Sequence, residues 1–111
     1  MIMNKLYYSP DAKSDLKEIK EYIEVELASP AAAKNTVSKI TKRIRQLEKF
    51  AQIGTPLSSV IDIDTDYRFL VCGNYLAFYR TTGENVNVTR VIYAKRDYIA
   101  ILFGGFRRGD F

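Results

Sequence analysis

The chain has no histidine among its 111 residues, and this absence narrows the chemistry that it can perform. It excludes Ser-His-Asp and Cys-His nucleophile systems as well as metal sites built on histidine. A single cysteine, Cys72, cannot build a thiolate zinc site or an internal disulfide. We therefore expect no metal ion and no cofactor, and we interpret Cys72 as a small buried residue.

The remaining candidates for chemistry are cations and phenols in the second half of the chain. From Tyr67 onward, seven basic and three acidic residues account for the whole net charge of +4. The candidate catalytic residues are Arg68, Arg90, Tyr93, Lys95 and Tyr98, and the candidate RNA-binding residues are Arg80 and Arg96. A guanidinium fork suits a phosphate group, and aromatic rings stack on unpaired bases. The charge favours a polyanion or an acidic protein as partner, although a solvated basic surface would give the same pattern.

These residue types are sufficient for RNA cleavage without a metal ion. The 2′-hydroxyl of RNA can attack the adjacent phosphate when a base removes its proton and an acid protonates the leaving oxygen. Arginines and a lysine would stabilise the developing negative charge, and a tyrosine or lysine would transfer the protons. The alternating Asp62, Asp64 and Asp66 lack the glycine and glutamate of a calcium loop, so we interpret them as a solvated acidic loop.

The elements that must position these side chains follow from the pattern of apolar residues. Residues 1–8 predict a strand. Residues 10–51 predict a hairpin of two amphipathic helices, because Ser-Pro start signals at Ser9 and Ser29 precede two runs of apolar residues with helical spacing. The first helix is acidic and the second is basic. We interpret this as charge complementarity along the hairpin, with a basic face for nucleic acid as the alternative.

The second half of the chain predicts a sheet. Residues 60–103 read as an antiparallel meander with a short strand near residues 60–63 and a last strand or apolar segment at residues 99–103, and residues 104–111 form a tail. The whole chain is then one α+β domain, with an N-terminal strand and an antiparallel helical hairpin packed on a three- to four-stranded antiparallel sheet. No apolar run approaches the roughly 20 residues of a membrane span, and no signal peptide is evident, so we expect a cytoplasmic protein.

Three stretches of the sequence resemble the RelE/ParE superfamily of type II toxins. They are YSPDAKSDL at residues 8–16, GTPL at 54–57 with YRFL at 67–70 and GNY at 73–75, and RVIYAKRDY at 90–98. The resemblance implies the fold described above. It also implies a cognate antitoxin as partner, which we expect to be acidic and partly disordered when alone.

The resemblance leaves the activity open, because RelE-like members cut mRNA on the ribosome whereas ParE-like members inhibit DNA gyrase without being nucleases. Arg68 matches an arginine used by the nucleases, and Arg90 falls at a second basic position of the family. Tyr93 stands where several nucleases carry a catalytic histidine, and Asp62, Asp64 and Asp66 occupy a strand that carries lysines in those enzymes. The long hairpin is more typical of ParE.

On these residues we favour a ribosome-dependent mRNA endonuclease that needs no metal. The alternatives are a ParE-like gyrase inhibitor without nuclease activity, and a non-toxic binding module on the same fold.

Overall fold

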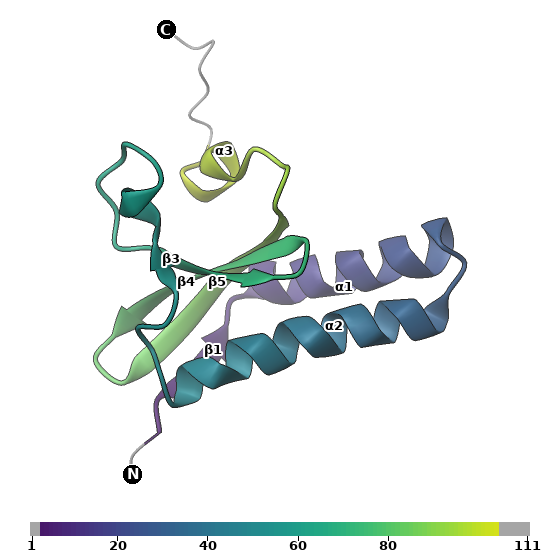
Figure 1. Cartoon of the computed structure of the whole chain (residues 1–111), viewed down its shortest axis with the longest axis horizontal. Coiled ribbons are helices and arrows are strands. Elements are labelled where there is room, and N and C mark those ends of the chain that lie inside the picture. The colour runs from purple at the N-terminus through teal and green to yellow at the C-terminus, as the bar shows by residue number, and fades with distance from the viewer. Residues whose placement is uncertain (1–2, 105–111) are drawn as a thin grey trace, which may run out of the picture.

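A helical hairpin lies on one face of a five-stranded sheet in the computed structural model, which describes residues 3–104 (Figure 1). The elements are β1 (Lys5–Tyr8), α1 (Pro10–Glu26), α2 (Pro30–Arg45), β2 (Thr55–Pro56), β3 (Arg68–Cys72), β4 (Tyr75–Thr82), β5 (Asn85–Tyr93) and α3 (Tyr98–Leu102), with short 3-10 helices at Gln46–Glu48 and Leu57–Ser59. The predicted α+β class and the order of strand, helical hairpin and sheet are confirmed.

The helical hairpin begins as the sequence predicts. The hydroxyl of Ser9 accepts a hydrogen bond from the Ala12 N–H, and the hydroxyl of Ser29 accepts one from the Ala32 N–H. A proline follows each cap at the first helical position. Residue Ala28 adopts a left-handed backbone (φ 47°) in the turn that joins the two helices.

The sheet is mixed, with strand order β1-β5-β4-β3-β2, and this differs from the predicted antiparallel sheet of three or four strands. The strand β1 runs parallel to β5 and pairs Lys5–Tyr8 with Asn85–Val88, whereas every other neighbouring pair is antiparallel. The fifth strand is β2, which comprises only Thr55 and Pro56. A two-residue strand leaves no periodic pattern in a sequence, so it could not be predicted from alternation.

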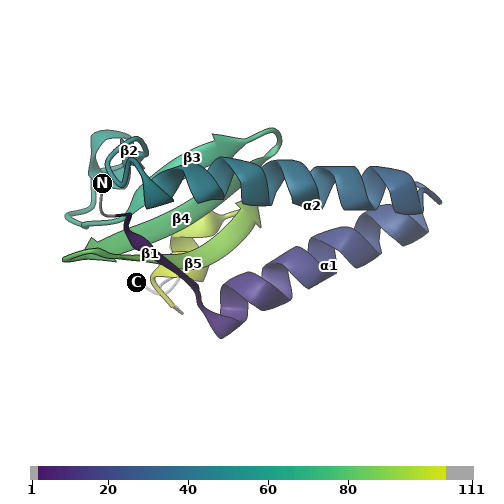
Figure 2. The same cartoon turned by 90° about the horizontal axis from the view of Figure 1, so that it is seen from below.

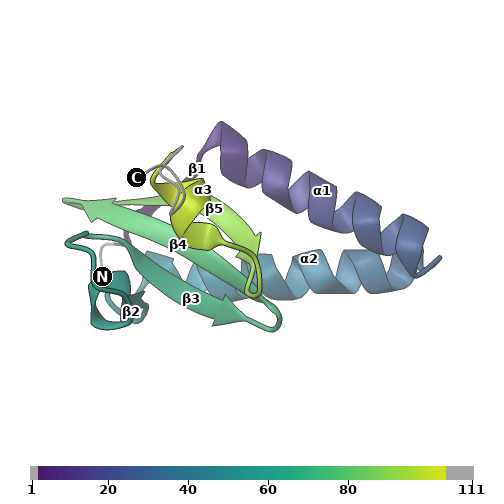
Figure 3. The ribbon, with the colours of Figure 1, turned by 90° about the horizontal axis from the view of Figure 1, so that it is seen from above.

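Two clusters of buried side chains fill the two faces of the sheet. On the hairpin side the cluster joins both helices to the sheet, and it includes Ile40, Ile44, Leu70, Tyr79, Val86, Val88 and Val91. On the other side Leu57, Tyr67, Phe78 and Ile92 are buried beneath α3 and the segment that precedes β3. Figure 3 shows α3 over the strands on the face opposite the hairpin. Helix α3 therefore partly covers the face of the sheet opposite the hairpin.

Two segments for which a strand was considered do not form one. Residues 60–63 form a turn and bend rather than a strand. Residues 98–102 form α3, because the Asp97 side chain caps the helix by accepting a hydrogen bond from the Ala100 N–H. An apolar run of this length fits either a strand or a helix, and here the Asp97 cap favours the helix. The predicted tail lies outside the described residues, apart from Gly104.

Candidate functional site

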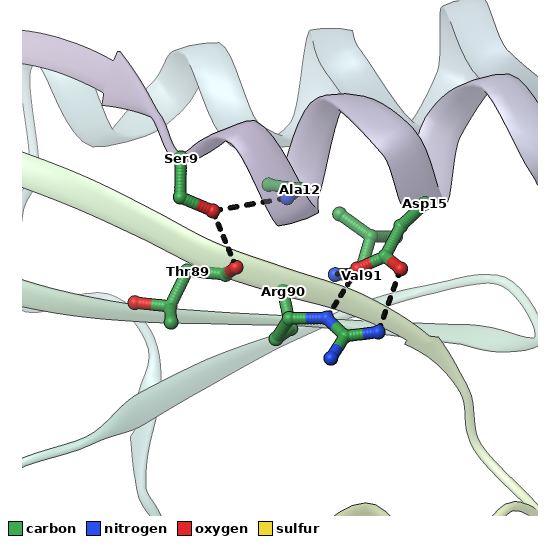
Figure 4. A network of polar contacts seen from close by, with 6 residues as sticks. All are labelled: Ser9, Ala12, Asp15, Thr89, Arg90 and Val91. Carbon is green, nitrogen blue, oxygen red and sulfur yellow. Dashed lines mark hydrogen bonds and ion pairs between the residues drawn. The ribbon is translucent and has the colours of Figure 1, made fainter. Parts of the chain in front are cut away.

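The entry into α1 is joined to β5 by a set of hydrogen bonds (Figure 4). The Ser9 N–H donates to the Val88 carbonyl at 2.9 Å, and the Ser9 hydroxyl donates to the Thr89 carbonyl at 2.6 Å. The same hydroxyl caps α1. One serine therefore ends the pairing of β1 with β5 and begins the helix.

The carboxylate of Asp15 continues this connection one turn later. It accepts two hydrogen bonds from the Arg90 guanidinium, both at 2.8 Å, and a third from the Val91 N–H at 2.9 Å. The pairing of β1 stops at Val88, so Asp15 supplies the acceptor that a neighbouring strand would have offered to β5. The pKa of Arg90 is raised, chiefly because its guanidinium donates hydrogen bonds to Asp15. The bidentate ion pair holds the guanidinium against α1.

The guanidinium of Arg68 is also held within the chain. It donates to the carbonyl oxygens of Gly54 at 2.7 Å and Gln52 at 3.3 Å. Beside it, the buried hydroxyl of Tyr79 donates to the Ala51 carbonyl at 2.8 Å and accepts from the Gly54 N–H at 2.9 Å. Arg68 and Tyr79 thus fix the turn that leads from the helices into the sheet.

The structure does not bring Arg68 and Arg90 together. In the strand register Arg68 pairs with Tyr79 and Arg90 pairs with Phe78. Successive residues of a strand point to opposite faces, and Tyr79 is buried on the hairpin side whereas Phe78 is buried beneath α3. The two side chains therefore leave the sheet on opposite faces, and that of Arg90 then reaches Asp15 of α1 at the edge of β5 that β1 does not cover.

The other predicted site residues also lie apart. The Arg80 side chain bonds to Asp66 at 2.7 Å, and its guanidinium lies 4.3 Å above the centre of the Tyr67 ring. The ring of Tyr98, the first residue of α3, packs against Phe78 with 5.3 Å between ring centres, so it faces the cluster on the side of the sheet opposite the hairpin.

Tyr93, Lys95 and Arg96 are exposed in and after the end of β5. A hydrogen bond from the Arg96 N–H to the Tyr93 carbonyl closes the turn that they form. The rings of Tyr93 and Tyr75 meet edge to face at 5.8 Å. Of the predicted site residues, only these three form a local group.

Tyr93 and Arg96 border a groove that the sequence did not predict. It has a volume of about 830 Å³ and lies between the hairpin and the end of the sheet, where it is lined by Tyr22, Leu27, Tyr75, Tyr93 and Arg96 among others. The hairpin extends past the sheet (Figure 2), so Leu27 is 64% exposed although it continues the apolar face of α1. The sequence feature that could have indicated this groove is Tyr22, an aromatic residue outside the apolar face of α1.

The thiol of Cys72 is buried on the wall of this groove. Burial raises its pKa from 9.0 to about 11 because the thiolate is disfavoured in a poorly hydrated site. The unfolded chain therefore loses this proton at a lower pH than the folded chain. The thiol's contribution to stability is present below pH 9 and is lost as the pH rises through about 11.

We expect the free energy of unfolding to fall between pH 9 and about 11, with about 2 to 3 kcal/mol of the fall due to Cys72. Urea denaturation at a series of pH values measures this. The pKa values of Tyr75 and Tyr79 are also raised by burial, so the matched variant Cys72→Ala should keep the tyrosine contribution and lose the thiol's. Equal pH dependence in both proteins would contradict the assignment.

Among residues 3–104, no group of three or more His, Cys, Asp or Glu side chains gathers where it could hold a metal ion. In the same range no helix is long and apolar enough to cross a membrane.

Comparison with solved structures shows what kind of fold this is. The chain is similar to a structure described as "Chromosomal ParDE TA system from P. aeruginosa", with a TM-score of 0.70 and 21% identity over 86% of this chain and 100% of that chain. No curated protein sequence matches. At this identity the similarity establishes the fold alone.

The family follows from the sequence. The family model for the ParE toxin of type II toxin-antitoxin system, parDE, matches residues 6–98. The chain belongs to this family, so it is a toxin of a type II toxin–antitoxin system, and the resemblance to the RelE/ParE superfamily is confirmed.

Proposed function

We propose that this toxin acts inside the cell by binding and inhibiting DNA gyrase, and that it does not cleave mRNA. The proposal rests on the contacts that the three arginines of the strands make within the chain. Arg90 is bound by Asp15, Arg68 by backbone carbonyls and Arg80 by Asp66, so each guanidinium already has a partner within the chain. The nuclease hypothesis needs these groups free to bind phosphate.

The positions of the two candidate phenols, Tyr93 and Tyr98, also argue against a nuclease. Phosphoryl chemistry of the nuclease type requires a base, an acid and cations that converge on one phosphate. Tyr98 is the first residue of α3 and packs on Phe78, whereas Tyr93 lies at the groove, so the two candidate phenols do not converge.

The groove suits a protein partner, and we assign it to the cognate antitoxin. Exposed apolar side chains surround it, with Tyr22 62% and Leu27 64% exposed, and tyrosine is favoured in the centres of protein interfaces. The similar structure from P. aeruginosa is described as a ParDE system, which implies a complex of toxin and antitoxin. An amphipathic segment of the antitoxin would bury the apolar side chains and pair with Lys39 and Arg96 at the rim.

Purified toxin should abolish supercoiling of relaxed plasmid by purified gyrase, and addition of the antitoxin should restore it. In parallel, primer extension on translated messages after induction should show intact mRNA at growth arrest. The contrary result, with codon-linked cuts and unaffected gyrase, would establish the nuclease in place of the proposal. Normal growth on expression without antitoxin would instead indicate a non-toxic binding module.

A further inference from the structure

The outward face of α2 is strongly and uniformly basic. The 16 residues of the helix contain five cations and no acid, and these cations are Lys34, Lys39, Lys42, Arg43 and Arg45. The opposite face is the buried one, formed by Ala33, Ile40 and Ile44. In Figure 2 the helix lies across the sheet with its outer side uncovered. Lys34, Lys42 and Arg45 are exposed on this side, whereas Arg43 is half-buried and Lys39 lies at the rim of the groove.

No ion pair within the described residues involves a cation of α2, and the helix dipole accounts for only part of this charge. In the described part of the chain no ion pair joins α2 to α1, so the predicted charge complementarity of the hairpin involves no direct pairing between the helices. Cations in the last turn stabilise the negative end of the helix dipole, which accounts for Lys42, Arg43 and Arg45. Lys34 lies near the positive end, where the dipole disfavours a cation.

The spacing of the cations matches a linear polyanion. At 100° and 1.5 Å per residue, Lys34, Lys42 and Arg45 lie within about 80° of one another around the axis and span about 16 Å along it. Duplex DNA carries one negative charge per about 1.7 Å of its axis. The residues between the cations are polar, as Asn35 and Ser38 illustrate, and such side chains commonly donate to phosphate oxygens.

The composition of this face favours a duplex over a single strand or an apolar peptide. A single strand would need aromatic side chains on which unpaired bases stack, and α2 contains none. A stably bound peptide would need apolar anchors, and those lie at the groove instead. We propose that the outer face of α2 binds the phosphate backbone of duplex DNA without sequence preference. This inference does not depend on which protein the toxin inhibits.

Fluorescence anisotropy of the full chain with a short labelled duplex of arbitrary sequence tests the proposal. Three phosphate contacts, from Lys34, Lys42 and Arg45, predict a slope of log K against log salt of about −2.7, or about 40-fold weaker binding at 200 mM than at 50 mM salt. The variant Lys34→Gln/Lys42→Gln should reduce the slope to about −0.9. Glutamine is a good helix former, so the fold should be kept, which circular dichroism checks.

The matched control is Lys13→Gln/Lys17→Gln, which removes the same charge from two exposed positions of α1. It should keep the wild-type slope. Three outcomes would overturn the proposal: no binding by the wild-type protein, an equal loss in the control variant, or equally tight binding of single-stranded RNA or polyglutamate. If the α2 double variant unfolds, Arg45→Gln takes its place, and an unchanged slope for that variant counts against the proposal.

Discussion

Replacing Asp15 with alanine should lower the free energy of unfolding by about 3 to 5 kcal/mol, because it leaves a guanidinium without its partner in a largely buried place. The Asp15 side chain is 9% exposed and that of Arg90 is 24% exposed. The substitution also removes the acceptor for the buried Val91 N–H. Total stabilities of small domains are about 5 to 15 kcal/mol, so the variant should be close to unfolded at 25 °C. Urea denaturation followed by circular dichroism measures the change.

The control is Asp11→Ala, which removes an exposed carboxylate from the first turn of the same helix. It should lose at most about 1 kcal/mol, the usual value of an acid at the positive end of a helix. In the double variant Asp15→Ala/Arg90→Met the unpaired charge is gone, so part of the stability should return, with a coupling energy of about 2 kcal/mol. A loss no larger than that of the control would show that this pair does not hold α1 on the sheet.

The Asp15–Arg90 ion pair also shows why the helices and strands could be predicted from the sequence more accurately than the site. Helix starts depend on neighbours in the chain, and Ser9 and Ser29 cap the helices where predicted. Arg90 and Asp15 are 75 residues apart, and no local pattern links them. In the sequence, an arginine among apolar residues gives the same pattern whether its guanidinium binds a phosphate or an aspartate.

The predicted convergence of Arg68 and Arg90 failed for a related reason. Which face a strand residue occupies depends on the register of the strands, and one extra residue reverses it. Here the register shifts between Phe78 and Tyr79 of β4, the positions that pair with Arg90 and Arg68. The parallel pairing of β1 with β5 likewise depends on the tertiary structure, because the four residues of β1 could pair with a neighbouring strand in either direction.

A second large effect is expected at Gly54, where Gly54→Ala should cost about 3 kcal/mol. A Cβ atom at this position would lie 2.4 Å from the Tyr79 hydroxyl oxygen and 2.6 and 2.8 Å from two ring carbons. Tyr79 is fully buried, so its ring cannot move aside without disturbing the core. The backbone itself is not the obstacle, because Gly54 lacks the positive φ of Gly73, Gly83 and Gly104.

The close contact can be tested separately from the loss of flexibility that any glycine substitution brings. Tyr79→Leu removes the ring and the hydroxyl, so it should destabilise the protein by itself through a cavity and two lost hydrogen bonds. In that background Gly54→Ala should cost less than about 1 kcal/mol, which corresponds to a coupling energy of about 2 kcal/mol between the two positions. Additive losses would mean that the ring does not exclude a side chain at Gly54, and that the turn held by Arg68 and Tyr79 is free to move.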